Sequence, residues 1–168
     1  EAVAAGVDKV RINPGNIGSE ERVHKVVEAC GNAGVAIRVG VNGGSLNKRL
    51  LEKYGAPTAD ALAESAMEHV ALLEKYGFTD TVISIKSSSV KTMINACRLV
   101  AQRCDYPLHL GVTEAGTERM GIIKNAIGIG SLLVDGIGST VRVTLTADPV
   151  REIYAAKDIL KAAGVRHF

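Results

Sequence analysis

Short β-branched runs alternate along the chain with segments whose apolar residues recur at helical spacing. The first run, residues 7–13 (VDKVRIN), ends at a Pro-Gly-Asn turn. Val23, Val26, Val27 and Cys30 follow it at i, i+3, i+4 and i+7, the spacing of one helical face. This pattern predicts a β-strand followed by an amphipathic helix.

The same pattern occurs four more times. Further strands are expected over residues 35–42, 81–86, 107–113 and 140–146, each followed by helical periodicity. Capping residues mark the expected ends of the helices, because Ser, Thr and Asp favour the N-cap and Gly favours the position after the last turn. The expected caps are Ser19, Ser45, Thr58 and Asp148 (with Pro149 in the first turn), and the expected helix ends are Gly34, Gly55, Gly77 and Gly164. Units of about 34 residues are typical of a βα repeat and predict a parallel sheet covered by helices.

Two architectures accommodate five βα units: an open doubly wound sheet, and part of a (β/α)₈ barrel. The pairs Gly128/Gly130 and Gly136/Gly138 lack the third glycine of a dinucleotide fingerprint and do not follow a strand. Polar residues instead gather toward the C-terminal end of every expected strand, which is the face where a barrel builds its site. An open sheet concentrates its ligand at one switch point. The distribution therefore favours a partial barrel, with residues 7–13 and 140–146 as the two edge strands.

The composition of the chain argues against several classes of protein. The 20 Lys and Arg against 18 Asp and Glu leave a net charge of +2, and aromatic residues make up 4%. This balance argues against a nucleic-acid-binding or membrane-surface protein. No apolar run approaches the ~20 residues that cross a bilayer. Cys30, Cys97 and Cys104 are odd in number and form no CxxC motif, which argues against a disulfide scaffold or a self-contained iron–sulfur site.

The charged residues within apolar strands indicate an anionic ligand. Arg11, Arg38 and Arg142 each interrupt such a strand, where an unpaired charge is costly. Internal salt bridges are the alternative, but Glu114 is the only carboxylate expected at the strand ends. The surplus of cations suits a phosphate or diphosphate, which Arg binds bidentately. The turns at 14–16 and 43–45 offer backbone N–H groups to the same oxygens.

Lys86 and Glu114 each allow more than one interpretation. Lys86 fits a Schiff-base nucleophile, a phosphate ligand or an ion pair, and the neighbouring arginines favour phosphate. Glu114 fits a proton donor or electrostatic stabiliser, or a residue that only orients an arginine. His24, His69 and His109 show no metal-ligand spacing, and His109 is interpreted as a core histidine.

Several motifs in this order resemble the (E)-4-hydroxy-3-methylbut-2-enyl diphosphate synthase family over essentially the whole chain. The motifs are RINPGNIG (11–18), RVGVNGGSL (38–46), EKYG (52–55), ESAMEHV (64–70), PLHLGVTEAG (107–116) and AIGIGSLLVDGIGSTVRVTLTADPVREI (126–153). The family's fold is a (β/α)₈ barrel followed by an iron–sulfur domain. The resemblance implies that residues 1–168 form strand–helix units four to eight of that barrel. Because the chain opens on Glu1 within what reads as the end of a helix, it is expected to be a piece of a longer protein, with the iron–sulfur domain following residue 168.

The resemblance also implies an activity. The family reductively opens 2-C-methyl-D-erythritol 2,4-cyclodiphosphate, using two electrons and a [4Fe–4S] cluster, in the non-mevalonate isoprenoid pathway. Glu114 would be catalytic, and the pocket residues implied are Arg11, Asn13, Arg38, Asn42, Lys86, Thr113, Arg142 and Thr144. Thr144 departs from the Ser expected in many members but keeps the hydroxyl. The cluster would be bound by the family's C-terminal domain, with no metal ligand in this chain, and flavodoxin or ferredoxin would supply electrons to a cytoplasmic bacterial homodimer.

Two other functions stay open at this point. One is a different phosphate-binding barrel enzyme, such as a Schiff-base aldolase centred on Lys86. The other is a non-catalytic binding or assembly module. The segment alone is expected to be inactive, because it lacks the family's cluster ligands.

Overall fold

The computed structural model describes residues 1–14 and 16–168, and its strands form one parallel sheet in the order β1-β2-β3-β4-β5. The strands are β1 (Lys9–Ile12), β2 (Ala36–Asn42), β3 (Thr81–Lys86), β4 (Leu108–Leu110) and β5 (Thr140–Val141). The helices are η1 (Pro14–Asn16), α1 (Glu20–Ala33), η2 (Gly43–Ser45), α2 (Lys48–Tyr54), α3 (Ala59–Lys75), α4 (Val90–Ala101), α5 (Glu118–Val134) and α6 (Pro149–Ala162). The predicted α/β order is confirmed.

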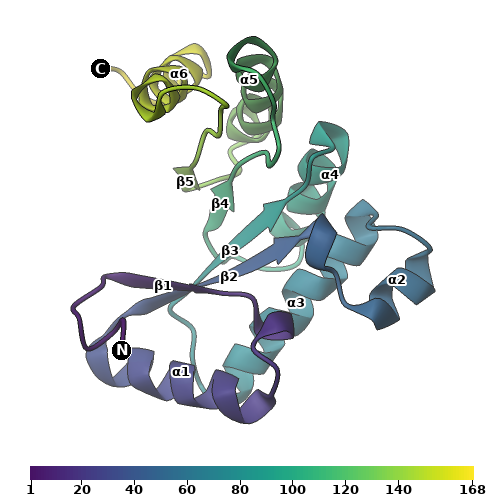
Figure 1. Cartoon of the computed structure of the whole chain (residues 1–168), viewed down its shortest axis with the longest axis vertical. Helices are drawn as coiled ribbons and strands as arrows, with labels where there is room; N and C mark the ends of the chain where they lie inside the picture. The colour runs from purple at the N-terminus through teal and green to yellow at the C-terminus, as the bar shows by residue number, and fades with distance from the viewer.

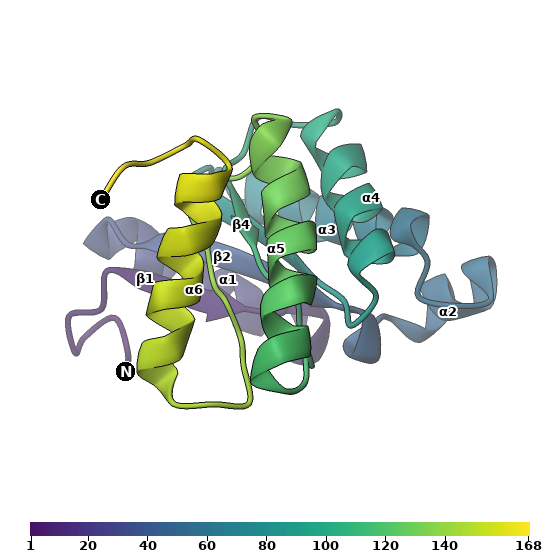
Figure 2. The same ribbon diagram turned by 90° about the horizontal axis from the view of Figure 1, so that it is seen from above.

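The sheet curves inside an arc of helices, which runs from α1 through α3 and α4 to α5 and α6 (Figure 1). Seen from above, α4, α5 and α6 stand in a row along one side of the sheet (Figure 2). β1 and β5 pair with one neighbour each, so they are the two edges and the barrel is not closed. This arrangement confirms the predicted partial barrel and its edge strands. Within the described residues, no helix is both long and apolar enough to cross a membrane.

The two faces of the sheet differ in polarity because successive residues of a strand point to opposite sides. Ile37, Val39, Ile83, Leu108 and Leu110 lie on the face that packs against the helices, and all are buried in the main hydrophobic core. Pairing of Arg38 with Arg11, of Asn42 with Lys86, and of His109 with Ser84 and Thr140 places these residues on the opposite, inner face. The polar residues of the strands therefore share one surface.

The helix ends follow the predicted signals. The side chains of Ser19, Thr58 and Asp148 accept hydrogen bonds from first-turn N–H groups of α1, α3 and α6. Gly34 and Gly77 adopt left-handed φ angles of 65° and 70° beyond α1 and α3, a conformation that glycine takes at little steric cost. Local capping chemistry thus fixes where these helices start and stop.

Three boundary predictions were wrong. Strands expected over 107–113 and 140–146 end at Leu110 and Val141. Beyond them the backbone bonds elsewhere: the Thr113 N–H donates to the Ser87 carbonyl (3.4 Å), and the Leu145 N–H donates to the Glu152 carboxylate (2.9 Å). Ser45 does not cap a helix, because it ends η2 and Asn47 caps α2.

Candidate anion-binding site

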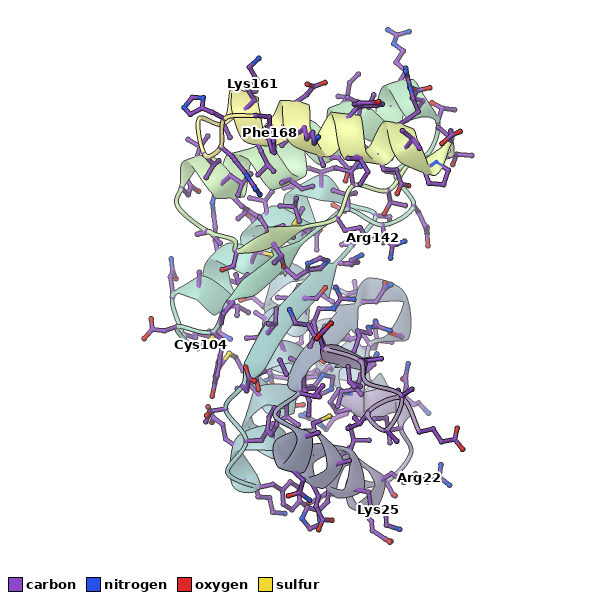
Figure 3. The ribbon with its side chains drawn as sticks, turned by 90° about the vertical axis from the view of Figure 1, so that its left-hand side faces the viewer. Arg22, Lys25, Cys104, Arg142, Lys161 and Phe168 are labelled. Carbon is purple, nitrogen blue, oxygen red and sulfur yellow. The ribbon has the colours of Figure 1, made fainter. Side chains whose placement is uncertain are left out.

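Four cationic side chains face one another across the inner side of the sheet. Arg11 and Arg38 are paired neighbours on β1 and β2, and Lys86 ends β3. Arg142 directly follows β5, on the side of the sheet facing away from α6 (Figure 3). The charges of all three arginines act on Lys86, so the four side chains, here called the cation cluster, share one site.

Two glycines make room for members of this cluster. A Cβ on Gly40 would lie 2.5 Å from Nε and 2.8 Å from Nη2 of Arg11, so the guanidinium rests against the backbone of β2. A Cβ on Gly111 would lie 3.5 Å from Cε and 3.6 Å from Nζ of Lys86, and 2.8 Å from the Arg142 carbonyl oxygen. In both places a cation from one strand covers the glycine of the next, and a larger residue would crowd it.

Burial and mutual repulsion lower the pKa values of two members of the cation cluster. Burial, followed by the charges of Arg142, Arg38 and Arg11, lowers the pKa of Lys86 to about 8. Burial, followed by the charges of Arg11 and Arg142, also lowers the pKa of Arg38. Among the ion pairs of the described residues, none includes a member of the cluster. The positive charge is therefore uncompensated, which favours an anionic ligand over internal salt bridges.

Asn13 and Asn42 both hold the turn beside the cluster. The Asn13 Nδ2 donates to Ser45 Oγ at 3.2 Å, and Asn42 Oδ1 accepts from the Gly44 N–H at 3.1 Å. The Gly44 amide proposed for phosphate is thus already bonded within the chain. In the other proposed turn, the Asn16 N–H donates to the Asn13 carbonyl, and Gly15 lies outside the described residues. The two asparagines shape the rim next to Arg11 and Lys86.

Thr113, Glu114 and Thr144 lie in the segments that follow the two shortest strands. Thr113 and Thr144 are half-buried, and the Thr144 carbonyl accepts from Asn125 Nδ2 at 3.2 Å. Glu114 is exposed with φ 51°, the only positive φ among the non-glycine residues that the structure describes. A side-chain-bearing residue in this region is uncommon, and such strain clusters at functional sites.

His109 also belongs to this face, although its apolar sequence context indicated a core histidine. It is 9% exposed, and its Nδ1 lies 2.7 Å from Thr140 Oγ1. Burial and the charges of Arg38, Lys86, Lys9 and Arg142 lower its pKa to about 4. The alternation in PLHLGVT, which puts His109, Gly111 and Thr113 in one phase, is the signal that could have placed it here.

The three cysteines do not fit an iron–sulfur cluster. Cys30 is buried in α1 and Cys97 in α4, and burial raises the pKa of the Cys97 thiol to about 12. In the part of the chain that the structure describes, no three His, Cys, Asp or Glu side chains are grouped to hold a metal ion. Cys30 and Cys97 lie on separate outer helices and Cys104 is half-buried after α4, so the three thiols match small core residues.

Comparison with a protein-family model and comparison with individual proteins agree on the family that this chain resembles. Residues 1–157 match the GcpE TIM-barrel domain. The chain is 61% identical over 160 residues to 4-hydroxy-3-methylbut-2-en-1-yl diphosphate synthase (flavodoxin) of Fusobacterium nucleatum subsp. nucleatum, covering 95% of the chain and 45% of that protein. For the proteins of the same name from Clostridium perfringens and Symbiobacterium thermophilum, identities are 60% over 164 residues and 57% over 166 residues. These alignments cover 98% and 99% of the chain but 47% and 45% of the relatives, so the chain spans a little less than half their length.

Proposed function

The chain belongs to the GcpE TIM-barrel domain family, and on that basis we propose that it forms the substrate-binding part of a diphosphate synthase. The enzyme would convert 2-C-methyl-D-erythritol 2,4-cyclodiphosphate to (E)-4-hydroxy-3-methylbut-2-enyl diphosphate in the non-mevalonate pathway. The relatives that cover the chain are named as synthases of this product. The observation that carries the proposal is the cation cluster on the inner face, which has no carboxylate partner among the described residues.

The cation cluster supplies the hydrogen-bond donors and the positive charge that a cyclic diphosphate needs. Each guanidinium offers a planar pair of N–H donors to a phosphate oxygen pair, and Lys86 adds a compact charge. An anion among them relieves the repulsion that lowers the pKa of Lys86, so binding also favours its protonated form. In this proposal the remaining polar residues complete the rim, namely Asn13, Asn42, Thr113 and Thr144.

Glu114 is proposed as the catalytic carboxyl group of this segment. It directly follows Thr113 and is held in a left-handed conformation just beyond β4. In this position it would face the carbon skeleton and donate a proton, or stabilise charge, where the ring carbon–oxygen bond breaks. The rest of the site binds and orients the diphosphate.

The reduction also needs an electron source. The relatives' name includes flavodoxin, and we propose a flavodoxin-type donor for this enzyme as well. The family's [4Fe–4S] cluster would supply the electron transfer when bound. Cys30, Cys97 and Cys104 do not fit it, so its ligands would be other residues than these.

A Schiff-base aldolase is the second candidate, favoured only by the lowered pKa of Lys86. Burial and three arginines account for that pKa, and the relatives are named as synthases rather than aldolases. Borohydride treatment in the presence of a carbonyl substrate should therefore leave Lys86 unmodified. Covalent trapping at Lys86 would favour the aldolase over the diphosphate synthase.

Turnover by the full-length gene product tests the proposal. With reduced flavodoxin and the cyclodiphosphate, wild-type protein should release the linear diphosphate. Glu114→Gln should lower kcat by ~10²–10⁴-fold, the range for a general acid, with little change in substrate Kd. Glu118→Gln, in the first turn of α5, is a control that should keep near-normal turnover. Wild-type protein that neither binds nor converts the cyclodiphosphate would refute the assignment.

A further inference from the structure

His109 occupies the middle of the inner face, directly beside the cation cluster. It pairs in register with Ser84 of β3 on one side and Thr140 of β5 on the other. Its side chain is buried, as is the Ser84 side chain next to it. The position is therefore within the site rather than in the hydrophobic core, which lies on the other face of the sheet.

The two ring nitrogens of His109 have different surroundings. Nδ1 lies 2.7 Å from Thr140 Oγ1, whereas Nε2 is buried without a hydrogen-bond partner among the described residues. Buried polar atoms in folded proteins are nearly always hydrogen-bonded, so a buried nitrogen without a partner needs an explanation. The Nε of Arg38, on the same face, is also buried without a partner. Two unsatisfied nitrogens at one site indicate that a partner that accepts hydrogen bonds is missing there.

Burial and the surrounding charges determine the protonation state of His109. Arg38, Lys86, Lys9 and Arg142 are the charged groups that act on it, and all are cations. With burial, they keep the imidazole neutral, so one nitrogen carries a proton and the other accepts. The Thr140 hydroxyl can donate to Nδ1, and in that arrangement Nε2 carries the proton.

We propose that His109 is a further diphosphate-binding residue, whose Nε2–H donates to a phosphate oxygen held by the cation cluster. The inference rests on the proposed function and adds a ligand-binding residue to it. In this proposal the Thr140 hydroxyl, whose Oγ1 lies 2.7 Å from Nδ1, donates to that nitrogen and thereby selects the tautomer. A neutral donor at this depth adds a hydrogen bond without a fifth charge in an already repulsive cluster. The bound anion satisfies the nitrogen that is unpartnered in the free protein.

A purely structural role predicts different behaviour. In that case His109 would only join β4 to β5 through Nδ1 and Thr140, and Nε2 would be irrelevant. Two amide substitutions separate the alternatives, because the terminal amide of Gln reaches the place of Nε2 and that of Asn reaches the place of Nδ1. His109→Gln keeps a donor for the ligand, and His109→Asn keeps a partner for Thr140.

Calorimetric titration of inorganic pyrophosphate into the full-length gene product is the test. His109→Gln should bind within about threefold of wild type. His109→Asn should lose roughly ten- to a hundredfold in affinity, the range for one hydrogen bond to a charged group. The reverse order would overturn the His109 inference while leaving the proposed function in place. Wild-type protein that binds no pyrophosphate would overturn both.

Nitrogen NMR of the wild-type histidines gives a second readout that needs no variant. Addition of pyrophosphate should leave His109 neutral with the proton on Nε2 and shift the Nε2 resonance in the direction of a stronger donated hydrogen bond. An Nε2 resonance that does not move while pyrophosphate binds would contradict the assignment. His24 in α1, which is exposed and stacks on Tyr76 at the end of α3, serves as an internal control that should not respond.

Discussion

At the residue scale, the site depends on small side chains as much as on charged ones. Arg11 lies against Gly40, and Lys86 lies against Gly111. Neither glycine has a positive φ, so their value here is the absence of a Cβ rather than conformational freedom. Each glycine lets a cation lie close to the backbone of the next strand, which sets where its charge is presented.

Gly40→Ala is expected to displace Arg11 without unfolding the protein. The new methyl group would overlap the guanidinium, which is the far end of a flexible side chain and is free to move away. Pyrophosphate affinity should fall several-fold, while the midpoint of thermal unfolding changes little. Both are measurable by calorimetry. Unchanged affinity would show that the position of Arg11 over Gly40 does not matter for binding.

Gly130→Ala is the matched control for that variant. A Cβ at this helical position would meet no atom within 4 Å. Removing a glycine from the interior of α5 should raise the free energy of unfolding by roughly 0.5–1 kcal/mol and leave pyrophosphate affinity unchanged.

Lys86 gives the site a dependence on pH. Its pKa of about 8 lies below the usual 10.5, so its charge is lost as the pH rises through 8. Sulfate, whose own charge is constant in this range, should therefore bind more weakly above pH 8. Lys86→Gln should bind more weakly than wild type below pH 8 and show no such step, whereas Lys91→Gln on the exposed surface of α4 should behave like wild type. A wild-type affinity that is flat from pH 7 to about 9.5 would contradict this role.

The same pKa has the opposite consequence for stability. Between pH 8 and 10.5 the unfolded chain holds the Lys86 proton more tightly than the folded chain. The contribution of Lys86 to the free energy of unfolding therefore rises with pH across this window.

The charged residues of the cation cluster were predictable from the sequence for a physical reason. Arg11, Arg38 and Arg142 are conspicuous because a charge in an apolar run needs a partner. His109 is not conspicuous in this way, because a neutral histidine is common in hydrophobic cores. Its surroundings depend on the register of β4 against β3 and β5, which local pattern does not specify.

At the element scale, the segment beyond β5 shows how a side chain replaces the hydrogen bonds of a neighbouring strand. After Val141 the backbone N–H of Leu145 donates to Glu152, and Thr146 pairs only as an isolated bridge with Thr117. Glu152 in the first turn of α6 therefore anchors the segment that carries Arg142 and Thr144. Helix caps were predictable because they use neighbouring residues. The ends of β4 and β5 were not predictable, because their hydrogen bonds are made with residues across loops.

Glu152→Ala tests this anchor. Loss of the acceptor leaves the partly buried Leu145 N–H without its partner, which costs about 1–3 kcal/mol of unfolding free energy. Denaturant unfolding measures the loss, and hydrogen exchange should increase at Leu145. Glu152→Gln retains an acceptor oxygen and should restore most of both values. An alanine variant as stable as wild type, with unchanged exchange, would argue against the anchor.

At the scale of the whole molecule, one curved parallel sheet separates a hydrophobic core from a polar inner face. The alternation of strands and helices was sufficient to predict the parallel topology and the two edge strands. The sheet curves inside the arc of helices (Figure 1), and the cations of its inner face lie close enough for their charges to act on one another. A cation on β1 and another beyond β5 thereby act on the same lysine, although they are 131 positions apart in the sequence.

We propose that this inner face binds a cyclic diphosphate through the cation cluster. A crystal structure of the full-length gene product with 2-C-methyl-D-erythritol 2,4-cyclodiphosphate tests it most directly. Phosphate oxygens should lie within hydrogen-bond distance of Arg38, Lys86 and Arg142, with Arg11 still resting against Gly40. A bound cyclodiphosphate that makes no contact with these side chains would contradict it.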